Sequence, residues 1–312
     1  MKAFGFNQFG DPDVFETLDV PIPAPKKGRV LVQTRAFAMN PFDSKMRQGS
    51  VSSKKPPVFP TIPGSDVAGT VVSKAPDVTD FEVGDAVFGR VFKGAYAEFV
   101  SVPHLKLVKK PANLSFGEAA GIPNAGITAF DILKSAVSLE NATSILVLGA
   151  SGAVGAFTTQ IAKAMGLFVA ATASVKHTDF VNRLGVDLFI PVSQLAQRNF
   201  LDHAPVDILI DATPHPYANA QNSLRWLKAG GQLVALNDFS PDFTTQDHHL
   251  IAFNDAVYHQ NKKALIYLSE LVTHNQLKIN LAKQLPFTVE GVIAGQKLLD
   301  SHHAPGKIVV TK

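Results

Sequence analysis

The chain has 312 residues, 46% of them hydrophobic and 18% charged, which is enough for two globular domains and lies outside the disordered range. Twenty-nine Lys and Arg against 26 Asp and Glu leave a net charge of +3 without a long basic run, so we do not expect a nucleic-acid partner. The absence of cysteine excludes disulfides, thiolate nucleophiles and Cys-ligated zinc or iron–sulfur centres. The N-terminus lacks an apolar leader-like stretch, and no window approaches the roughly 18 apolar residues of a membrane span. These features predict a cytoplasmic protein without a membrane partner.

The first third of the chain is predicted to form a β-rich unit. It contains short runs rich in Val and Phe that are separated by Gly and Pro, which is typical of an all-β barrel or sandwich. The runs are 29–37, 66–73, 85–92 and 95–102.

From about residue 115 strands and helices alternate. Helical segments at 115–137, joined at Gly121–Pro123, precede an apolar strand at 142–150. This period predicts parallel βαβ units and hence a doubly wound sheet. The later segments are helices at 153–166 and 177–185 and strands at 167–174, 187–192, 207–213 and 231–237.

The last 50 residues contain two helices, a strand-like run at 278–287 and the closing strand GKIVVTK at 306–312. These strands need partners, so we expect the chain to return to the N-terminal β unit. The predicted fold class is therefore α/β, with residues 1–117 and 263–312 in a β-rich domain and residues 118–262 in a doubly wound domain.

The sequence GASGAVG follows the predicted strand ILVL and begins a predicted helix, which is the context of a dinucleotide-binding loop. One glycine permits the tight turn, the next lets backbone approach the pyrophosphate, and the third lets the helix pack closely. The spacing is G-x-x-G-x-x-G, and a merely structural turn is the alternative interpretation. The predicted phosphate-binding residues are Gly149, Ala150, Ser151, Gly152, Ala153, Val154 and Gly155.

The end of the second strand of this unit indicates which dinucleotide binds. An acidic residue about 20 positions beyond the glycines would bind the ribose hydroxyls of NAD. Here Ser174 occupies that place and Lys176 follows, with no carboxylate from Ala170 to Thr178. This pattern favours a 2′-phosphate and therefore NADP (NADPH). A surface loop that happens to carry a lysine is the alternative.

Seven segments in order resemble the medium-chain dehydrogenase/reductase superfamily, and the chain is most similar to its zinc-independent quinone oxidoreductase (zeta-crystallin-like) branch. The resemblance covers nearly all 312 residues. It implies a GroES-like catalytic domain and a Rossmann domain with NADPH in the cleft between them. It also implies a homodimer. The segments are PGSDVAGTVV (63–72), VGDAVFG (83–89), GAYAEFV (94–100), AAGIPNAGITAF (119–130), GASGAVG (149–155), AGGQLVALN (229–237) and GKIVV (306–310).

The resemblance also implies roles for single residues. Asn40 matches an asparagine beside the nicotinamide, and Thr128 matches a threonine that faces the same end of the cofactor. Lys307 matches a lysine near the cofactor cleft, with a surface lysine as the alternative. Asp43 matches a family aspartate that either caps a helix or takes part in the chemistry. A tyrosine often found two residues later is replaced by Lys45, so the proton donor is not identified.

No metal is expected. The zinc branch uses a cysteine ligand and a histidine near the PGSDVAG segment, whereas this chain has no cysteine and reads Gly64-Ser65-Asp66 there. Catalytic zinc needs three protein ligands. The adjacent histidine pairs at 248–249 and 302–303 do not have the spacing of ligands on one helix face.

These observations predict an NADPH-dependent reductase that transfers hydride to a quinone or an α,β-unsaturated carbonyl. One alternative is an NADPH-binding protein with a structural, sensing or nucleic-acid role and little turnover. Another is an enoyl-thioester reductase. Four phenylalanines are candidates for an apolar substrate pocket, but because the chain contains 22 Phe, we favour a place in the core for each: Phe42, Phe59, Phe92 and Phe253.

Overall fold

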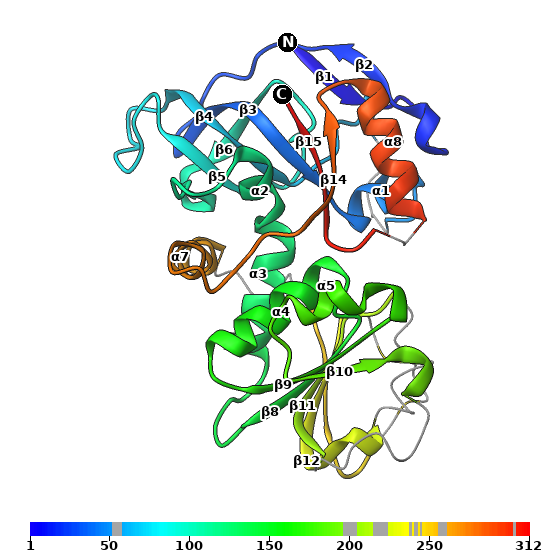
Figure 1. The fold of residues 1–312 in the computed structure, drawn as a ribbon. Helices are drawn as coiled ribbons and strands as arrows, with labels where there is room; N and C mark the ends of the chain where they lie inside the picture. The colour runs from blue at the N-terminus through cyan, green and yellow to red at the C-terminus, as the bar shows by residue number, and fades with distance from the viewer. Residues whose placement is uncertain are drawn as a thin grey trace. The chain divides into compact units, whose positions relative to one another are not determined.

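The computed structural model describes residues 1–51, 58–195, 205–214, 224–236, 239, 243, 245–254, 261–301 and 304–312. His302 and His303 lie outside the described residues, as does the last residue of the segment 229–237. The chain divides into two compact units (Figure 1). The first comprises Met1–Asn124, Asn261–Thr273 and Ile279–Lys312, and the second comprises Ala125–Gln260 and His274–Lys278. The expected domain boundaries at 117/118 and 262/263 stay a prediction, and the compact units divide at 124/125, 260/261, 273/274 and 278/279.

The first unit is built on a seven-stranded sheet in which β3 (Arg29–Met39) is the central strand. This strand pairs antiparallel with three others, because its 11 residues are long enough for two partners to share one edge. The other strands of this sheet are β4 (Asp66–Lys74), β5 (Ala86–Arg90), β6 (Phe99–Pro103), β7 (Leu107–Lys109), β14 (Leu281–Pro286) and β15 (Lys307–Thr311). A separate two-stranded sheet joins β1 (Lys2–Gly5) to β2 (Glu16–Asp19).

The C-terminal strand returns to this first unit, as predicted. β15 pairs antiparallel with β3, with Val309 opposite Ala38. Buried residues from both ends of the chain, including Phe37 and Val310, share one hydrophobic core. Helix α8 (Val289–Asp300) lies beside α1 (Pro41–Arg47) in Figure 1. The remaining helices of this unit are α2 (Phe116–Gly121) and α7 (Asn261–Thr273).

The second unit contains a six-stranded parallel sheet, so the predicted doubly wound architecture is confirmed. The strand order is β10-β9-β8-β11-β12-β13. The order reverses between β8 and β11, and in open parallel sheets ligands bind beyond the carboxyl ends of the strands at this point. The strands are β8 (Ser144–Leu148), β9 (Phe168–Ala173), β10 (Leu188–Pro191), β11 (Val206–Asp211), β12 (Leu227–Ala235) and β13 (His249–Ala252).

Three helices of the second unit matter for the site. Helix α3 (Pro123–Asp131) begins at the division between the units and continues into a π-helical turn at Ile132–Ala136. Helix α4 (Ala153–Ala164) packs against β8 and β9, and α5 (Thr178–Asn182) against β9 and β10.

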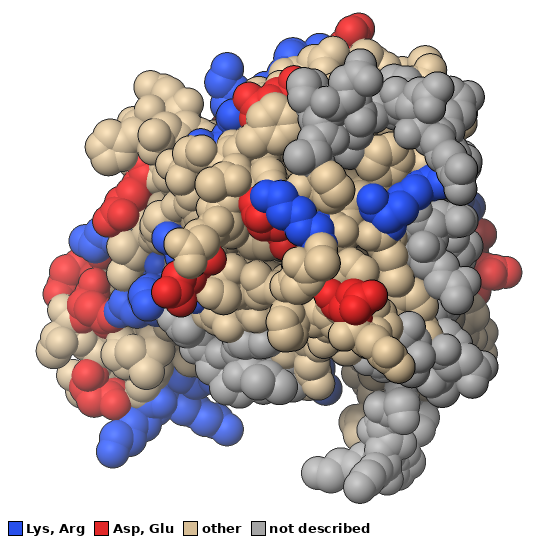
Figure 2. Space-filling model, turned by 90° about the horizontal axis from the view of Figure 1, so that it is seen from below, with Lys and Arg blue, Asp and Glu red and all other residues tan. Residues whose placement is uncertain are grey.

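Charged side chains of both signs lie close together on the face of the molecule seen in Figure 2. None of the helices in the described part of the chain is long and apolar enough to span a bilayer.

Candidate functional site

The glycine loop lies between the end of β8 and the start of α4, where the sequence predicted it. Gly149 has a φ of +77°. The tight turn therefore favours glycine, because a residue with a β-carbon is strained in this conformation. A β-carbon on Gly155 would lie 2.4 Å from the Gly149 carbonyl oxygen, so this glycine permits the close approach of the helix to the loop. These two glycines therefore have the structural roles that the pattern predicts.

Gly152 differs from the other two because only one protein atom lies near the space where a side chain would begin. It precedes α4 in an extended conformation (φ −75°, ψ 164°), and an added β-carbon would meet only the Gly149 carbonyl oxygen at 3.3 Å. The first N–H groups of a helix have no partner within it, which here leaves those of Ala153, Val154 and Gly155 to bind a ligand. The helix dipole also favours an anion at this end. The loop thus fits the diphosphate of a dinucleotide.

The neighbouring strand ends lie against this loop. Ala150 donates a backbone hydrogen bond of 2.9 Å to the Thr172 carbonyl oxygen on β9. A β-carbon on Gly149 would lie 3.2 Å from the Ala212 carbonyl oxygen, just beyond β11. Two residues after Thr172, Ser174 begins an exposed 3-10 turn that contains Lys176. Both side chains are exposed beyond the carboxyl end of β9, where an adenosine ribose would lie if the loop holds the diphosphate.

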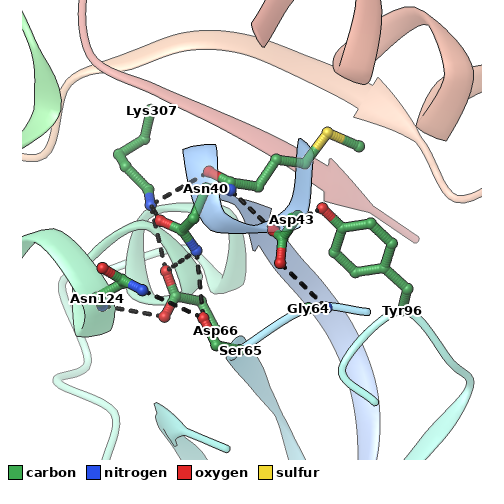
Figure 3. Close-up of polar contacts among 9 residues, drawn as sticks. Asn40, Asp43, Gly64, Ser65, Asp66, Tyr96, Asn124 and Lys307 are labelled. Atoms are coloured by element: carbon green, nitrogen blue, oxygen red, sulfur yellow. Dashed lines mark hydrogen bonds and ion pairs between the residues drawn. The ribbon is translucent and has the colours of Figure 1, made fainter. Parts of the chain in front are cut away.

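The first unit contains a second group of the predicted residues, joined by hydrogen bonds (Figure 3). Asn40, at the end of β3, donates from its amide nitrogen to Asp66 Oδ2 at 3.0 Å and to Ser65 Oγ at 3.4 Å. Lys307, the first residue of β15, donates to Asn40 Oδ1 at 2.6 Å and to Asp66 Oδ2 at 3.2 Å. Lys307 is only 3% exposed, so the surface-lysine alternative is wrong.

Asp66 is the centre of this network, and the sequence did not single it out for that role. Its carboxylate also accepts the backbone N–H of Asn124 at 3.0 Å, and the Asn124 side chain donates to Ser65 Oγ at 3.3 Å. In the sequence, Ser65 and Asp66 stand out only as the residues present where the zinc branch has a histidine. A buried carboxylate opposite a buried lysine has no signal in local sequence, because the two residues are on different strands.

Asp43 is confirmed as a helix-capping residue. Its carboxylate accepts the backbone N–H of Asn40 and the hydroxyl of Tyr96, both at 2.9 Å, and the N–H of Gly64 at 3.3 Å. Burial raises the pKa of Asp43 to about 6, against the lowering effect of these hydrogen bonds. Burial and the nearby Asp43 also raise the pKa of Tyr96. The carboxylate therefore holds α1 in place at Asn40.

The other predicted residues have different environments. Thr128 is buried in α3, within the second unit. Lys45 is exposed on α1. Phe42 and Phe92 are 40% and 76% exposed, so the core interpretation is wrong for both, because α1 and the turn after β5 present them to solvent. Phe59 packs against the core of the first unit, and Phe253 is buried.

Known proteins resemble this chain over its whole length. Residues 26–112 match the family model of the alcohol dehydrogenase GroES-like domain. The chain is 32% identical to an Arabidopsis thaliana chloroplastic NADPH-dependent alkenal/one oxidoreductase over 99% of its length and 79% of that protein's. It is 31% identical to the Triphysaria versicolor chloroplastic quinone-oxidoreductase QR1 over 99% of this chain and 98% of that protein.

Solved structures agree with the sequence relatives. The quinone oxidoreductase from Coxiella burnetii superposes with a TM-score of 0.83 at 29% identity, covering 100% of this chain and 99% of that chain. The expected GroES-like and Rossmann architecture is thereby confirmed. With the glycine loop at the switch point of its parallel sheet and relatives at above 30% identity along its length, the chain belongs to the quinone oxidoreductase branch of the medium-chain dehydrogenase/reductase superfamily.

Proposed function

We propose that this protein is an NADPH-dependent oxidoreductase that reduces quinones or α,β-unsaturated carbonyls. The observation that carries the proposal is the open N-terminus of α4 beside Gly152, at the switch point of the parallel sheet. Relatives named for alkenal/one and quinone reduction support the substrate class, and the name of one includes NADPH dependence.

The residues have separable roles in this proposal. NADPH, when bound, supplies the hydride. The loop from Gly149 to Gly155 binds its diphosphate, and Ser174 and Lys176 bind its 2′-phosphate. Asn40 and Thr128 orient the nicotinamide end. Because Lys45 replaces the family tyrosine, we assign the protonation of the reduced product to solvent rather than to a side chain.

The experiment that tests this function follows NADPH oxidation at 340 nm with a 1,4-benzoquinone and with an enone. We expect turnover with at least one of the two classes. Binding of NADPH without turnover on a wide panel would favour a structural or sensing role. Turnover with enoyl thioesters alone would favour an enoyl-thioester reductase.

We further propose a homodimer that forms through β13. Among the described residues β13 pairs with β12 alone, so its other edge is open. Phe253 donates its N–H to Ala235 on the β12 side, and because successive N–H groups alternate in direction, that of Ala252 points outward. Light scattering should give twice the 33.4 kDa of the chain, and Ala252→Pro should give monomer. A wild-type monomer at micromolar concentration would contradict this proposal.

A cytoplasmic location stays a prediction from the sequence, and localisation of a tagged chain in its own cells tests it.

A further inference from the structure

Lys307 is a buried lysine whose three donors all point at protein acceptors. Its ammonium lies 2.6 Å from Asn40 Oδ1, 3.2 Å from Asp66 Oδ2 and 3.4 Å from the Met39 carbonyl oxygen. Lys307 is 3% exposed and Asp66 is fully buried. Burying a charge costs several kcal/mol unless it is paired and hydrogen-bonded. Since replacing a buried ion pair by apolar residues is often neutral or stabilising, stability alone is a weak account of this pair.

The pair lies on both sides of the Asn40 carboxamide. Lys307 donates to the amide oxygen, while the amide nitrogen donates to Asp66 and Ser65 (Figure 3). If the carboxamide turned over, its NH₂ group would face the ammonium and its oxygen would face the carboxylate. Both contacts would then be repulsive, because the ammonium has no acceptor and the carboxylate has no donor. The two charges therefore select one orientation of the amide.

We propose that Lys307 and Asp66 are positioning residues that hold the Asn40 carboxamide in the single orientation that the reaction requires. This inference rests on the proposed function, in which Asn40 lies at the reactive end of NADPH. It also changes the role expected of Lys307, because the ammonium acts through Asn40 and does not bind the cofactor. A misplaced orienting group lowers the rate steeply, since hydride transfer depends on the alignment of the reacting atoms.

Three variants separate positioning from stability: Lys307→Met, Asp66→Asn and the two combined. Lys307→Met leaves an unpaired buried carboxylate and should lower Tm. The double variant removes both charges and should regain most of that Tm. It does not restore the selection of one amide orientation, because the carboxamide introduced at position 66 offers a donor as well as an acceptor to Asn40.

The first measurement needs no cofactor. The Asn40 side-chain NH₂ is observed by ¹⁵N NMR in asparagine-labelled protein and assigned by its loss in Asn40→Ser. In the wild type, we expect one pair of signals with slow hydrogen exchange. In the double variant, we expect exchange at least about tenfold faster or a second pair of signals, because the flipped form becomes populated. Unchanged signals in the double variant would overturn the inference.

The second measurement is kinetic. In the double variant kcat should fall about tenfold or more, while the Kd for NADPH should change less. The reason is that the lost charges orient the Asn40 carboxamide for the reaction and do not bind the cofactor. Lys228→Met is the control: it breaks a more exposed Lys–Asp pair, Lys228–Asp207 at the amino end of β11, away from the loop, and should keep the wild-type kcat.

The outcomes remain distinguishable from failure of the proposed function. A wild type that is inactive on every acceptor would contradict the proposed function. The NMR measurement would still show whether the Asn40 carboxamide has one orientation. A double variant that regains both the Tm and the kcat of the wild type shows that the pair is only structural. If Lys307→Met does not fold, the NMR and the kinetic measurements are both made on the double variant.

Discussion

At the scale of single residues, the glycine loop separates a binding role from a folding role. Gly152 and Gly155 are three residues apart, yet an added β-carbon meets one atom at 3.3 Å in the first case and the Gly149 carbonyl oxygen at 2.4 Å in the second. The space beside Gly152 is free for a ligand, whereas the space beside Gly155 is filled by the loop itself.

We therefore expect Gly152→Val to fold and to raise the Kd for NADPH at least tenfold, or about 1.4 kcal/mol, because its side chain occupies the phosphate position. Gly155→Ala should instead lower the thermal stability, because backbone must move. Fluorescence titration and thermal melts of both variants check this pair of outcomes. If Gly152→Val binds NADPH with wild-type affinity, the loop has only a structural role.

Asp43 makes the stability of the protein depend on pH. Its pKa of about 6 in the fold lies above its usual value of 3.8, so the folded state binds this proton more tightly than the unfolded state. The contribution of Asp43 is fully present below about pH 4 and is lost as pH rises through about 6. The difference amounts to about 3 kcal/mol.

Asp43→Asn cannot titrate and should lack this component. The free-energy difference between wild type and variant should therefore shift by about 2.4 kcal/mol in favour of the variant between pH 4 and pH 7. Urea unfolding at both pH values measures it, and Asp11→Asn is a control on the surface. A constant difference across this range would mean that Asp43 titrates normally.

At the scale of elements, we expect the end of β9 to decide the choice of cofactor. Ser174 and Lys176 are exposed in the turn after this strand, two and four residues beyond the Thr172 carbonyl oxygen that holds the glycine loop. A 2′-phosphate is an anion, and each charge-assisted hydrogen bond to it contributes about 1.5–3 kcal/mol before solvent screening.

The wild type should prefer NADPH over NADH by roughly 10–1000-fold in kcat/KM. Lys176→Ala should weaken NADPH and leave NADH almost unaffected, because only the phosphate uses the ammonium. Ser174→Asp should lower the ratio further, since a carboxylate repels the phosphate and accepts from a ribose hydroxyl. A wild type that prefers NADH, or a ratio that Ser174→Asp does not move, would contradict this assignment.

At the scale of the whole molecule, the lack of cysteine and the sequence Gly64-Ser65-Asp66 predict a reaction that needs no metal. Within the described residues no three His, Asp or Glu side chains are grouped as ligands would be. The ammonium of Lys307 lies 2.6 Å from Asn40 Oδ1 and 3.2 Å from Asp66 Oδ2.

Because the chain lacks the cysteine and histidine ligands of the zinc branch, dialysis against a strong chelator should leave kcat/KM unchanged, with a zinc-dependent alcohol dehydrogenase treated in parallel as the positive control. Loss of activity that added Zn²⁺ restores would show that the reaction needs a metal.

Local patterns in the sequence determined much of this architecture. The alternation of apolar strands and amphipathic helices specifies a parallel sheet, because each strand must be covered by the helix that follows it. The glycine spacing specifies the turn at Gly149, since few other residues adopt a positive φ. The return of the last strand to the first unit was also predictable, because an unpaired strand leaves its backbone groups unsatisfied.

The environment of the polar residues was decided only by the tertiary structure. Asn40 and Lys307 are 267 residues apart in the chain, and they meet because β15 pairs with β3. Whether a lysine is buried depends on which strands flank it and which carboxylate faces it, and neither is a local property. For the same reason the sequence marked Asn40 and Lys307 separately, whereas the fold joins them, directly and through Asp66, into one hydrogen-bonded network.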